Sequence, residues 1–220
     1  MTAVGPRRAL LVAAAPSTQG RCEIVRSVAT EVDTVIGVDG GAALCLQCGV
    51  VPDVVVGDMD SLAPKAAEQL RQAGARFVVA STEKDVTDLD IAFEYCTLHA
   101  YEDVVVTACT GGRIDHSLAA IGTIARGFRL QPRIVEPGSE GWILEPTARG
   151  LVRLPKVGAT FSVIAVGTTA RVSVTGARWP LDSAAVEPLS SLGVSNVVGA
   201  DGAVVQVHEG IVLVLTNLTV

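Results

Sequence analysis

The feature that most constrains the fold is a regular alternation of short apolar runs with helical stretches, which continues to about residue 136. The runs are rich in Val, Ala, Leu and Ile, as in strands that are buried on both faces of a sheet. Strand, helix, strand repeated in this way predicts an α/β fold with a doubly wound, mostly parallel sheet and helices on both faces. The predicted strands cover 9–15, 33–38, 53–57, 76–80, 103–109 and 133–136, and the predicted helices 21–31, 41–48, 64–73, 87–100 and 116–127.

The helical pattern stops near residue 141, and short, alternating, Val-rich runs replace it. Gly and Pro interrupt these runs every several residues, which predicts a smaller antiparallel β-sandwich. We therefore expect an N-terminal α/β domain over 1–137 and a C-terminal β-sandwich domain over 138–220. The predicted sandwich strands cover 142–145, 150–154, 159–166, 170–175, 203–208 and 210–215.

Composition narrows the classes of function. Of 220 residues, 49% are apolar and 18% are charged, which excludes a disordered chain. The net charge is −6 and no basic run occurs, so we expect no nucleic-acid partner. No apolar stretch reaches membrane-spanning length, so we expect no membrane partner either.

The five cysteines are odd in number and scattered along the chain. This argues against a disulfide framework and for a reducing, cytoplasmic compartment. Cys45 and Cys48 form a CxxC pair, but no second pair and no nearby His accompanies it. We expect both to be small buried helix residues rather than zinc ligands or a redox pair.

Ligands of parallel sheets bind beyond the carboxyl ends of the strands, and four strands here end in acidic or Gly-rich motifs. Asp39-Gly40-Gly41-Ala42 follows the second strand and suits either a ligand or a tight turn. After the third strand, Asp58 and Asp60 are two residues apart, a spacing that aims two carboxylates at one point in extended backbone. This predicts a Mg²⁺ site, with a solvated pair that caps the next helix as the alternative.

The remaining two motifs each have a structural alternative. In 84–90, Asp88 is a candidate metal ligand and Lys84 a candidate phosphate contact, while Thr87 as N-cap with Asp90 in the first turn is the structural interpretation. In 110–117, a Gly pair and Arg113 before a helix form a plausible phosphate cradle, and a turn with Asp115 as N-cap is the alternative.

Taken together, the motifs resemble the thiamine pyrophosphokinase family. The matching segments are DGGA at 39–42, PDVVVGDMDS at 52–61, KDVTDLDIA at 84–92, GGRIDHSLA at 111–119, TGARWPL at 175–181 and GVSN at 193–196. Six segments in order over nearly the whole chain make the resemblance specific. It implies transfer of the pyrophosphoryl group of ATP to the thiamine hydroxyl, which gives thiamine diphosphate and AMP. It also implies Mg²⁺ as cofactor and a homodimer with active sites between subunits.

The resemblance also implies residue roles. Asp58, Asp60 and Asp88 match the Mg²⁺ ligands. The positions that match contacts to the nucleotide phosphates or the reacting hydroxyl are Asp39, Lys84, Gly111, Gly112, Arg113 and Asp115, among which Asp39, Arg113 and Asp115 are the catalytic candidates. Trp179, Ser195 and Asn196 match the thiamine site, with the Trp ring stacked on the substrate.

Two other functions use the same acidic motifs. One is a pyrophosphokinase for another heteroaromatic alcohol, such as a hydroxymethylpterin. The other is a sensor that binds a nucleotide or a thiamine derivative without turnover. An aromatic face suits the thiamine cation, so Trp179 favours thiamine, although a Trp in the sandwich core is the structural alternative.

Overall fold

The computed structural model describes residues 5–16, 19–80 and 85–217. The chain divides into two compact units. The first consists of Met1–Thr123 and Val135–Pro137, and the second of Ile124–Ile134 and Gly138–Val220. The assignment of ATP binding to 1–137 and of thiamine binding to 138–220 stays a prediction.

Parallel strands separated by helices build the first unit, in the spatial order β5-β1-β2-β3-β4. The strands are β1 (Arg8–Val12), β2 (Thr34–Val38), β3 (Val54–Gly57), β4 (Arg76–Val79) and β5 (Asp103–Thr107). The helices are α1 (Arg21–Ala29), α2 (Gly41–Gln47), α3 (Pro64–Gln72) and α4 (Asp88–Leu98). After them come α5 (Ile114–Arg126), the 3₁₀ turn η1 (Phe128–Leu130) and β6 (Arg133–Glu136).

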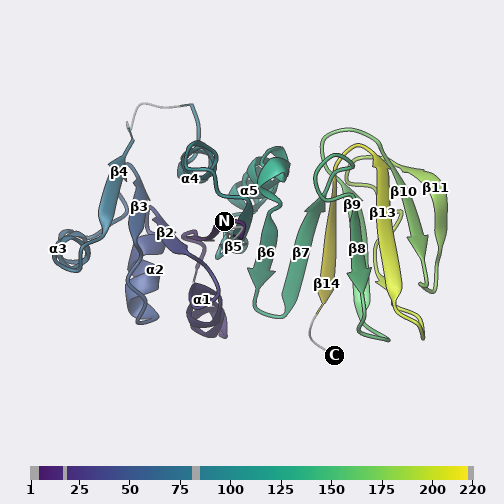
Figure 1. Ribbon diagram of the computed structural model, residues 1–220, viewed down its shortest axis with the longest axis horizontal. Coiled ribbons are helices and arrows are strands. Elements are labelled where there is room, and N and C mark those ends of the chain that lie inside the picture. The colour runs from purple at the N-terminus through teal and green to yellow at the C-terminus, as the bar shows by residue number, and fades with distance from the viewer. Residues whose placement is uncertain (1–4, 17–18, 81–84, 218–220) are drawn as a thin grey trace. The chain divides into compact units, whose positions relative to one another are not determined.

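Helices cover both faces of these parallel strands. Leu10 and Val12 of β1 pack against Val25 of α1 and Leu44 of α2. Leu11, the residue between them, is also fully buried and faces the other side, because successive side chains of a strand alternate. Figure 1 shows α1 and α2 on one side of the strands and α4, which contacts β2 and β3, on the other. The predicted α/β class with a mostly parallel sheet is confirmed.

The second unit is an antiparallel sandwich. One set of strands has the order β12-β9-β14-β7 and the other the order β11-β10-β13-β8. Side chains from both sets, among them Phe161, Val172 and Val205, form one buried core. The strands are β7 (Ser139–Leu144), β8 (Leu151–Leu154), β9 (Thr160–Ala165), β10 (Ala170–Thr175), β11 (Leu181–Val186), β12 (Asn196–Val197), β13 (Ala203–Glu209) and β14 (Val212–Asn217).

Two strands of the sandwich, β11 and the two-residue β12, are absent from the sequence prediction. Strand β11, Leu-Asp-Ser-Ala-Ala-Val, carries a single β-branched side chain, and three of its six residues are exposed. It lies at the edge of its sheet, where pairing with β10 holds it in place. Strand propensity is a weak predictor at such a position, because an edge strand depends on pairing with its neighbour rather than on burial.

The cysteine prediction is wrong in one respect: Cys22 and Cys48 form a disulfide. Their Cα atoms lie 4.8 Å apart because α1 and α2 pack on the same side of the sheet, which spacing along the chain does not reveal. Cysteine usage therefore no longer argues for a reducing compartment. Cys45, Cys96 and Cys109 are free and buried, and burial raises the pKa of Cys45 and of Cys96 to about 12.

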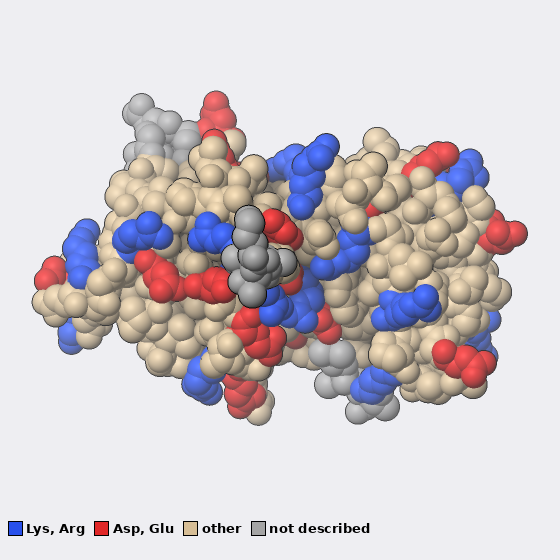
Figure 2. Space-filling view, viewed as in Figure 1, with Lys and Arg blue, Asp and Glu red and all other residues tan. Residues whose placement is uncertain are grey.

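Among the described residues, no helix is long and apolar enough to span a membrane. On the face that Figure 2 shows, Lys and Arg side chains are interspersed with Asp and Glu rather than gathered into one patch.

Candidate active site

Strands β2 and β3 end side by side in acidic residues. Val38 pairs with Val56 in parallel register, and the Asp39 amide donates to the Val56 carbonyl at 2.8 Å. Asp39 then takes a left-handed φ of 47°, which turns the chain into α2. Asp58 follows the end of β3 at Gly57, so both acids lie at the carboxyl edge of the sheet.

The glycines after Asp39 have a structural reason. A Cβ atom at Gly41 would lie 1.8 Å from the carbonyl oxygen of Val12, so only glycine lets α2 approach β1 this closely. The turn interpretation of this motif therefore holds for Gly41. Asp39 contributes its carboxylate to the acidic edge.

Asp39, Asp58 and Asp60 form an acid cluster, in which one carboxylate oxygen of each residue lies within 4.8 Å of those of the other two. Met59 has a φ of 67° and the Asp60 amide donates to Asp58 Oδ1 at 3.2 Å, so a turn rather than extended backbone brings the pair together. Asp39 Oδ1 is buried and has no hydrogen-bond partner among the described residues. Because such carboxylates repel one another without a cation, and Mg²⁺ prefers oxygen ligands, these residues fit a divalent ion.

Asp88 approaches the cluster from the first position of α4. A Cβ atom at Gly57 would lie 3.1 Å from both Asp88 Oδ1 and Asp39 Cβ, so glycine fills a narrow space between the two acids. The 4.8 Å cluster comprises the other three acids. The role of Asp88 as a metal ligand therefore stays a prediction.

The start of α4 is a capping box. The Thr87 hydroxyl accepts from the Asp90 amide, and the Asp90 carboxylate accepts from the Thr87 amide at 3.1 Å. Asp90 also accepts from the Thr123 hydroxyl at 2.8 Å. These contacts support the structural role expected for Asp90. Lys84, the predicted phosphate contact, lies outside the described residues.

The fourth motif forms a glycine turn and an exposed ion pair. Gly111 and Gly112 have φ values of 110° and 69°, and α5 begins at Ile114. Asp115 therefore lies within the first turn and is not the N-cap. Arg113 Nε donates to Asp115 Oδ1 at 3.1 Å. This hydrogen bonding is the largest cause that lowers the pKa of Asp115 from its ordinary 3.8 to about 2. A phosphate bound by Arg113 would have to compete with this carboxylate.

The predicted thiamine residues lie in the second unit. The Trp179 side chain is 53% exposed, with the Arg178 guanidinium 4.8 Å from its ring centre, so the alternative of a core Trp is wrong. Asn196 is buried: its Oδ1 accepts from the Trp179 amide at 3.1 Å and its Nδ2 donates to the Trp179 carbonyl at 2.6 Å. Asn196 thus fixes the backbone that carries the indole. Ser195 is exposed, has a φ of 59° and donates its amide to Ser162 Oγ at 3.1 Å.

Sequence reasoning did not single out Arg21 and Glu136. Arg21 begins α1 and Glu136 ends β6, and their side chains form an ion pair at 2.8 Å with 3% and 7% exposure. The available signals were a Glu at the end of a short strand and an Arg at the start of the first helix. Neither signal indicates the partner, which lies 115 positions away.

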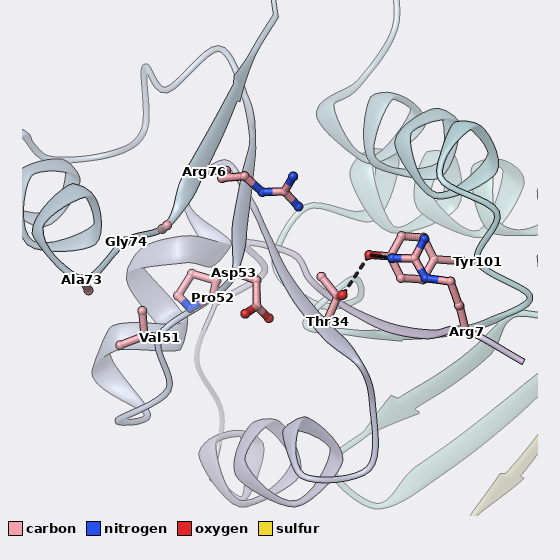
Figure 3. A pocket seen from close by; sticks show the side chains of 10 residues that line it. Arg7, Thr34, Val51, Pro52, Asp53, Ala73, Gly74, Arg76 and Tyr101 are labelled. Carbon is pink, nitrogen blue, oxygen red and sulfur yellow. Dashed lines mark hydrogen bonds between the residues drawn. The ribbon is translucent and has the colours of Figure 1, made fainter. Parts of the chain in front are cut away.

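A polar cavity of about 520 Å³ lies at the other end of the parallel strands (Figure 3). Thr34 and Arg76 are the first residues of β2 and β4, and Arg7 directly precedes β1. The dashed line in Figure 3 marks the Tyr101 hydroxyl donating to Thr34 Oγ1 at 2.8 Å. Since these positions are at the amino ends of the strands, the cavity is distinct from the acidic edge.

Two curated relatives are named as thiamine pyrophosphokinases. Thiamine pyrophosphokinase of Bacillus subtilis is 32% identical over 99 residues, 45% of this chain and 46% of that protein. Thiamine pyrophosphokinase 1 of Oryza sativa subsp. japonica is 28% identical over 156 residues, 67% of this chain and 59% of that protein. The matched part thus spans about half the length of these curated relatives.

Solved structures share the fold. The crystal structure of thiamine pyrophosphokinase from B. subtilis matches with a TM-score of 0.79 at 22% identity, over 97% of this chain and 100% of that chain. Yeast thiamin pyrophosphokinase matches with a TM-score of 0.77 at 13% identity, over 98% and 87%. At such identities the likeness establishes the fold.

Family profiles match both halves of the chain. The profile described as "Thiamin pyrophosphokinase, catalytic domain" matches residues 25–135, and "Thiamin pyrophosphokinase, vitamin B1 binding domain" matches residues 151–212. The first includes the acid cluster and the glycine turn before α5, and the second includes Trp179 and Asn196. With half of its length matched by the catalytic profile alone, the chain belongs to the thiamin pyrophosphokinase family.

Proposed function

We propose that this protein is a thiamine pyrophosphokinase, which transfers the pyrophosphoryl group of ATP to the hydroxyl of thiamine and releases AMP. The observation that carries the proposal is the acid cluster at the carboxyl edge, in a segment that matches the catalytic domain, followed by a match to a vitamin B1 binding domain. The names of the relatives favour catalysis over binding alone.

In this proposal the first unit binds Mg²⁺ and ATP. Asp39, Asp58 and Asp60 would hold the ion, with Asp88 beside them across Gly57. The ion would supply positive charge against the negative charge that develops on the transferred pyrophosphoryl group. Lys84, Arg113 and the turn at Gly111 and Gly112 would contact the polyphosphate through charge and backbone amides.

The reaction is an in-line displacement. The thiamine hydroxyl oxygen forms a bond to the β-phosphorus, and the bond from that phosphorus to the bridging α–β oxygen breaks. AMP leaves with the bridging oxygen, and the hydroxyl proton passes to a base. The protein contributes mainly position and charge, as in other phosphoryl transfers.

Two carboxylates were predicted as candidate bases, and their surroundings differ. Asp115 is paired with Arg113, and its pKa of about 2 makes it a weak base. This favours a role for Asp115 in orienting Arg113 until phosphate binds. Asp39 has two carboxylate oxygens, so one would hold the ion while the other orients the hydroxyl.

The second unit would bind thiamine through the exposed face of Trp179, because a Trp ring attracts a cation. Ser195 would contact the substrate directly. Asn196 acts through Trp179, since its amide group is engaged with the Trp179 backbone.

We also propose a homodimer with active sites between subunits, and a cytoplasmic location. Ile114 and Leu118 are one helical turn apart on α5 and are 76% and 53% exposed, which supports a face that a second copy covers. Light scattering of the purified protein measures the oligomeric state.

The test of the function is AMP release from Mg·ATP with and without thiamine, followed by mass analysis of the product. Thiamine-dependent AMP together with thiamine diphosphate is the expected result. Turnover with a hydroxymethylpterin but not with thiamine would show that the substrate is a different heteroaromatic alcohol. Binding of thiamine diphosphate without any turnover would show that the protein is a sensor and not an enzyme.

A separate variant tests the proposal that the acid cluster holds a metal ion. Asp60→Asn keeps the size of the side chain and removes one charge from the cluster. We expect turnover to fall at least about tenfold, which corresponds to about 1.4 kcal/mol in the barrier. Wild-type turnover in this variant would contradict the metal role of Asp60.

A further inference from the structure

A buried guanidinium holds the loop that follows β1. Arg21 is 2% exposed. Its Nη1 donates to the carbonyl of Ala15 at 3.0 Å and also to the carbonyl of Pro16, and its Nη2 donates to the carbonyl of Thr110 at 3.3 Å. One side chain thus satisfies carbonyl groups of two loops that lie outside regular secondary structure.

The partner carboxylate holds the loop that follows β5. Glu136 Oε1 accepts from the Cys109 amide at 2.9 Å, from the Thr110 amide at 3.1 Å and from the Thr110 hydroxyl at 3.2 Å. Its other oxygen, Oε2, accepts from Arg21 at 2.8 Å. The ion pair therefore links the two loops to each other.

The loop after β5 leads into the predicted phosphate cradle at 110–117, and the loop after β1 packs against it. The Ala15 amide donates to the Ala108 carbonyl at 2.8 Å. A Cβ atom at Gly112 would lie 2.9 Å from Pro16 Cγ, so the glycine turn packs directly on the first loop. Displacement of either loop would therefore move Gly112, next to Arg113.

We infer that Arg21 and Glu136 are positioning residues, which set the nucleotide-binding geometry of the loops 13–16 and 109–112 without contacting the nucleotide themselves. This inference rests on the proposed function for the identity of the ligand. It assigns a role to two residues outside the family motifs found in the sequence.

The burial of both charges explains why this ion pair can hold the two loops in place. A charge removed from water is costly unless it is paired and hydrogen-bonded, and here each charge has its partner and several backbone groups besides. An apolar pair of similar volume would fill the space but leave two amides and three carbonyls without these partners. The arrangement is thus suited to rigid loops rather than to stability alone.

The test uses Glu136→Gln in the full chain. The amide side chain presents a donor to Arg21 and a weaker acceptor to the loop amides. We expect the KM for Mg·ATP to rise at least tenfold and the KM for thiamine to change less than twofold. Because the change leaves Arg21 buried without a countercharge, the double variant Arg21→Met with Glu136→Met is made in parallel. It removes both charges, and the same selective rise in the KM for ATP is expected.

A matched control lies at the amino ends of β1 and β5, the strands that precede the two loops. Arg8 of β1 and Asp103 of β5 form a half-buried ion pair at 3.1 Å. Asp103→Asn should leave both KM values unchanged. Thermal unfolding of every variant separates loss of fold from loss of geometry. Equal KM changes for both substrates in Glu136→Gln, or no change, would overturn the inference.

Equilibrium binding of a non-hydrolysable ATP analogue separates this inference from the proposed function. If wild-type protein binds the analogue and Glu136→Gln weakens binding tenfold, but no thiamine diphosphate forms, the positioning role stands and the proposed function fails. If thiamine diphosphate forms and the variant binds the analogue normally, the positioning role fails alone. Absence of nucleotide binding by wild-type protein would overturn both.

Discussion

Replacing Asp39 with Asn separates the electrostatic cost of the acid cluster from its use in binding metal. At 4.8 Å, two unit charges repel by about 0.9 kcal/mol at the dielectric of water and by about 3.5 kcal/mol at an effective dielectric of 20. Asp39 and Asp58 are half-buried and Asp60 is exposed, so solvent screening brings the value towards the lower figure. Loss of one charge should therefore stabilise the metal-free protein, by about 1–3 kcal/mol in total.

Magnesium should stabilise the wild-type protein more than it stabilises Asp39→Asn. A ligand at a hundred times its dissociation constant stabilises the folded state by about 2.7 kcal/mol, which corresponds to a Tm increase of about 5–10 °C for a domain of this size. We expect this increase in the wild-type protein and less than a third of it in Asp39→Asn, which keeps fewer charges for the ion.

The assay is urea and thermal unfolding of both proteins in EDTA and in MgCl₂, with NaCl added to equal ionic strength, because salt also screens the repulsion. Glu94→Gln is the matched control, since Glu94 is an exposed acid on α4 outside the cluster. The reasoning is refuted if Asp39→Asn is less stable than wild type in EDTA and keeps the full response to Mg²⁺.

Three further predictions concern other parts of the chain. Arg113→Gln should return the pKa of Asp115 from about 2 towards 3.8, which ¹³C NMR titration of the carboxyl group measures. Because the pKa is lowered in the folded protein, the ion pair stabilises the protein above about pH 4, and its contribution is lost as the pH falls towards 2. Trp179→Ala should weaken thiamine binding by about 1–2 kcal/mol, or five- to thirtyfold, and abolish fluorescence quenching by thiamine. Reduction of the Cys22–Cys48 disulfide, which spans 26 positions, should lower the free energy of unfolding by about 3.5 kcal/mol in urea titrations.

The last two of these predictions have internal controls. Trp142, the other tryptophan, is partly buried against the sandwich core, so Trp142→Phe should leave thiamine quenching intact. A double Cys→Ser variant at 22 and 48 should be insensitive to reductant. An Asp115 midpoint that stays near pH 2 without Arg113, or thiamine affinity unchanged without Trp179, would contradict the respective assignment.

Local patterns were sufficient to predict most of the fold. The periods of 2 and 3.6 residues arise within single elements, so the strands and helices of both halves could be read without knowing their neighbours. The prediction of acids at the carboxyl edge needed only the rule that parallel strands end together. Edge strand β11 was missed because its stability comes from pairing with β10.

Tertiary structure alone decided which side chains meet. The strand order β5-β1-β2-β3-β4 brings Asp39 to the carboxylates that follow β3, and the packing of α1 beside α2 closes the Cys22–Cys48 disulfide. It also turned Asn196 inward to the backbone of Trp179. Contacts between residues far apart in sequence depend on the arrangement of whole elements, and no local spacing encodes that arrangement.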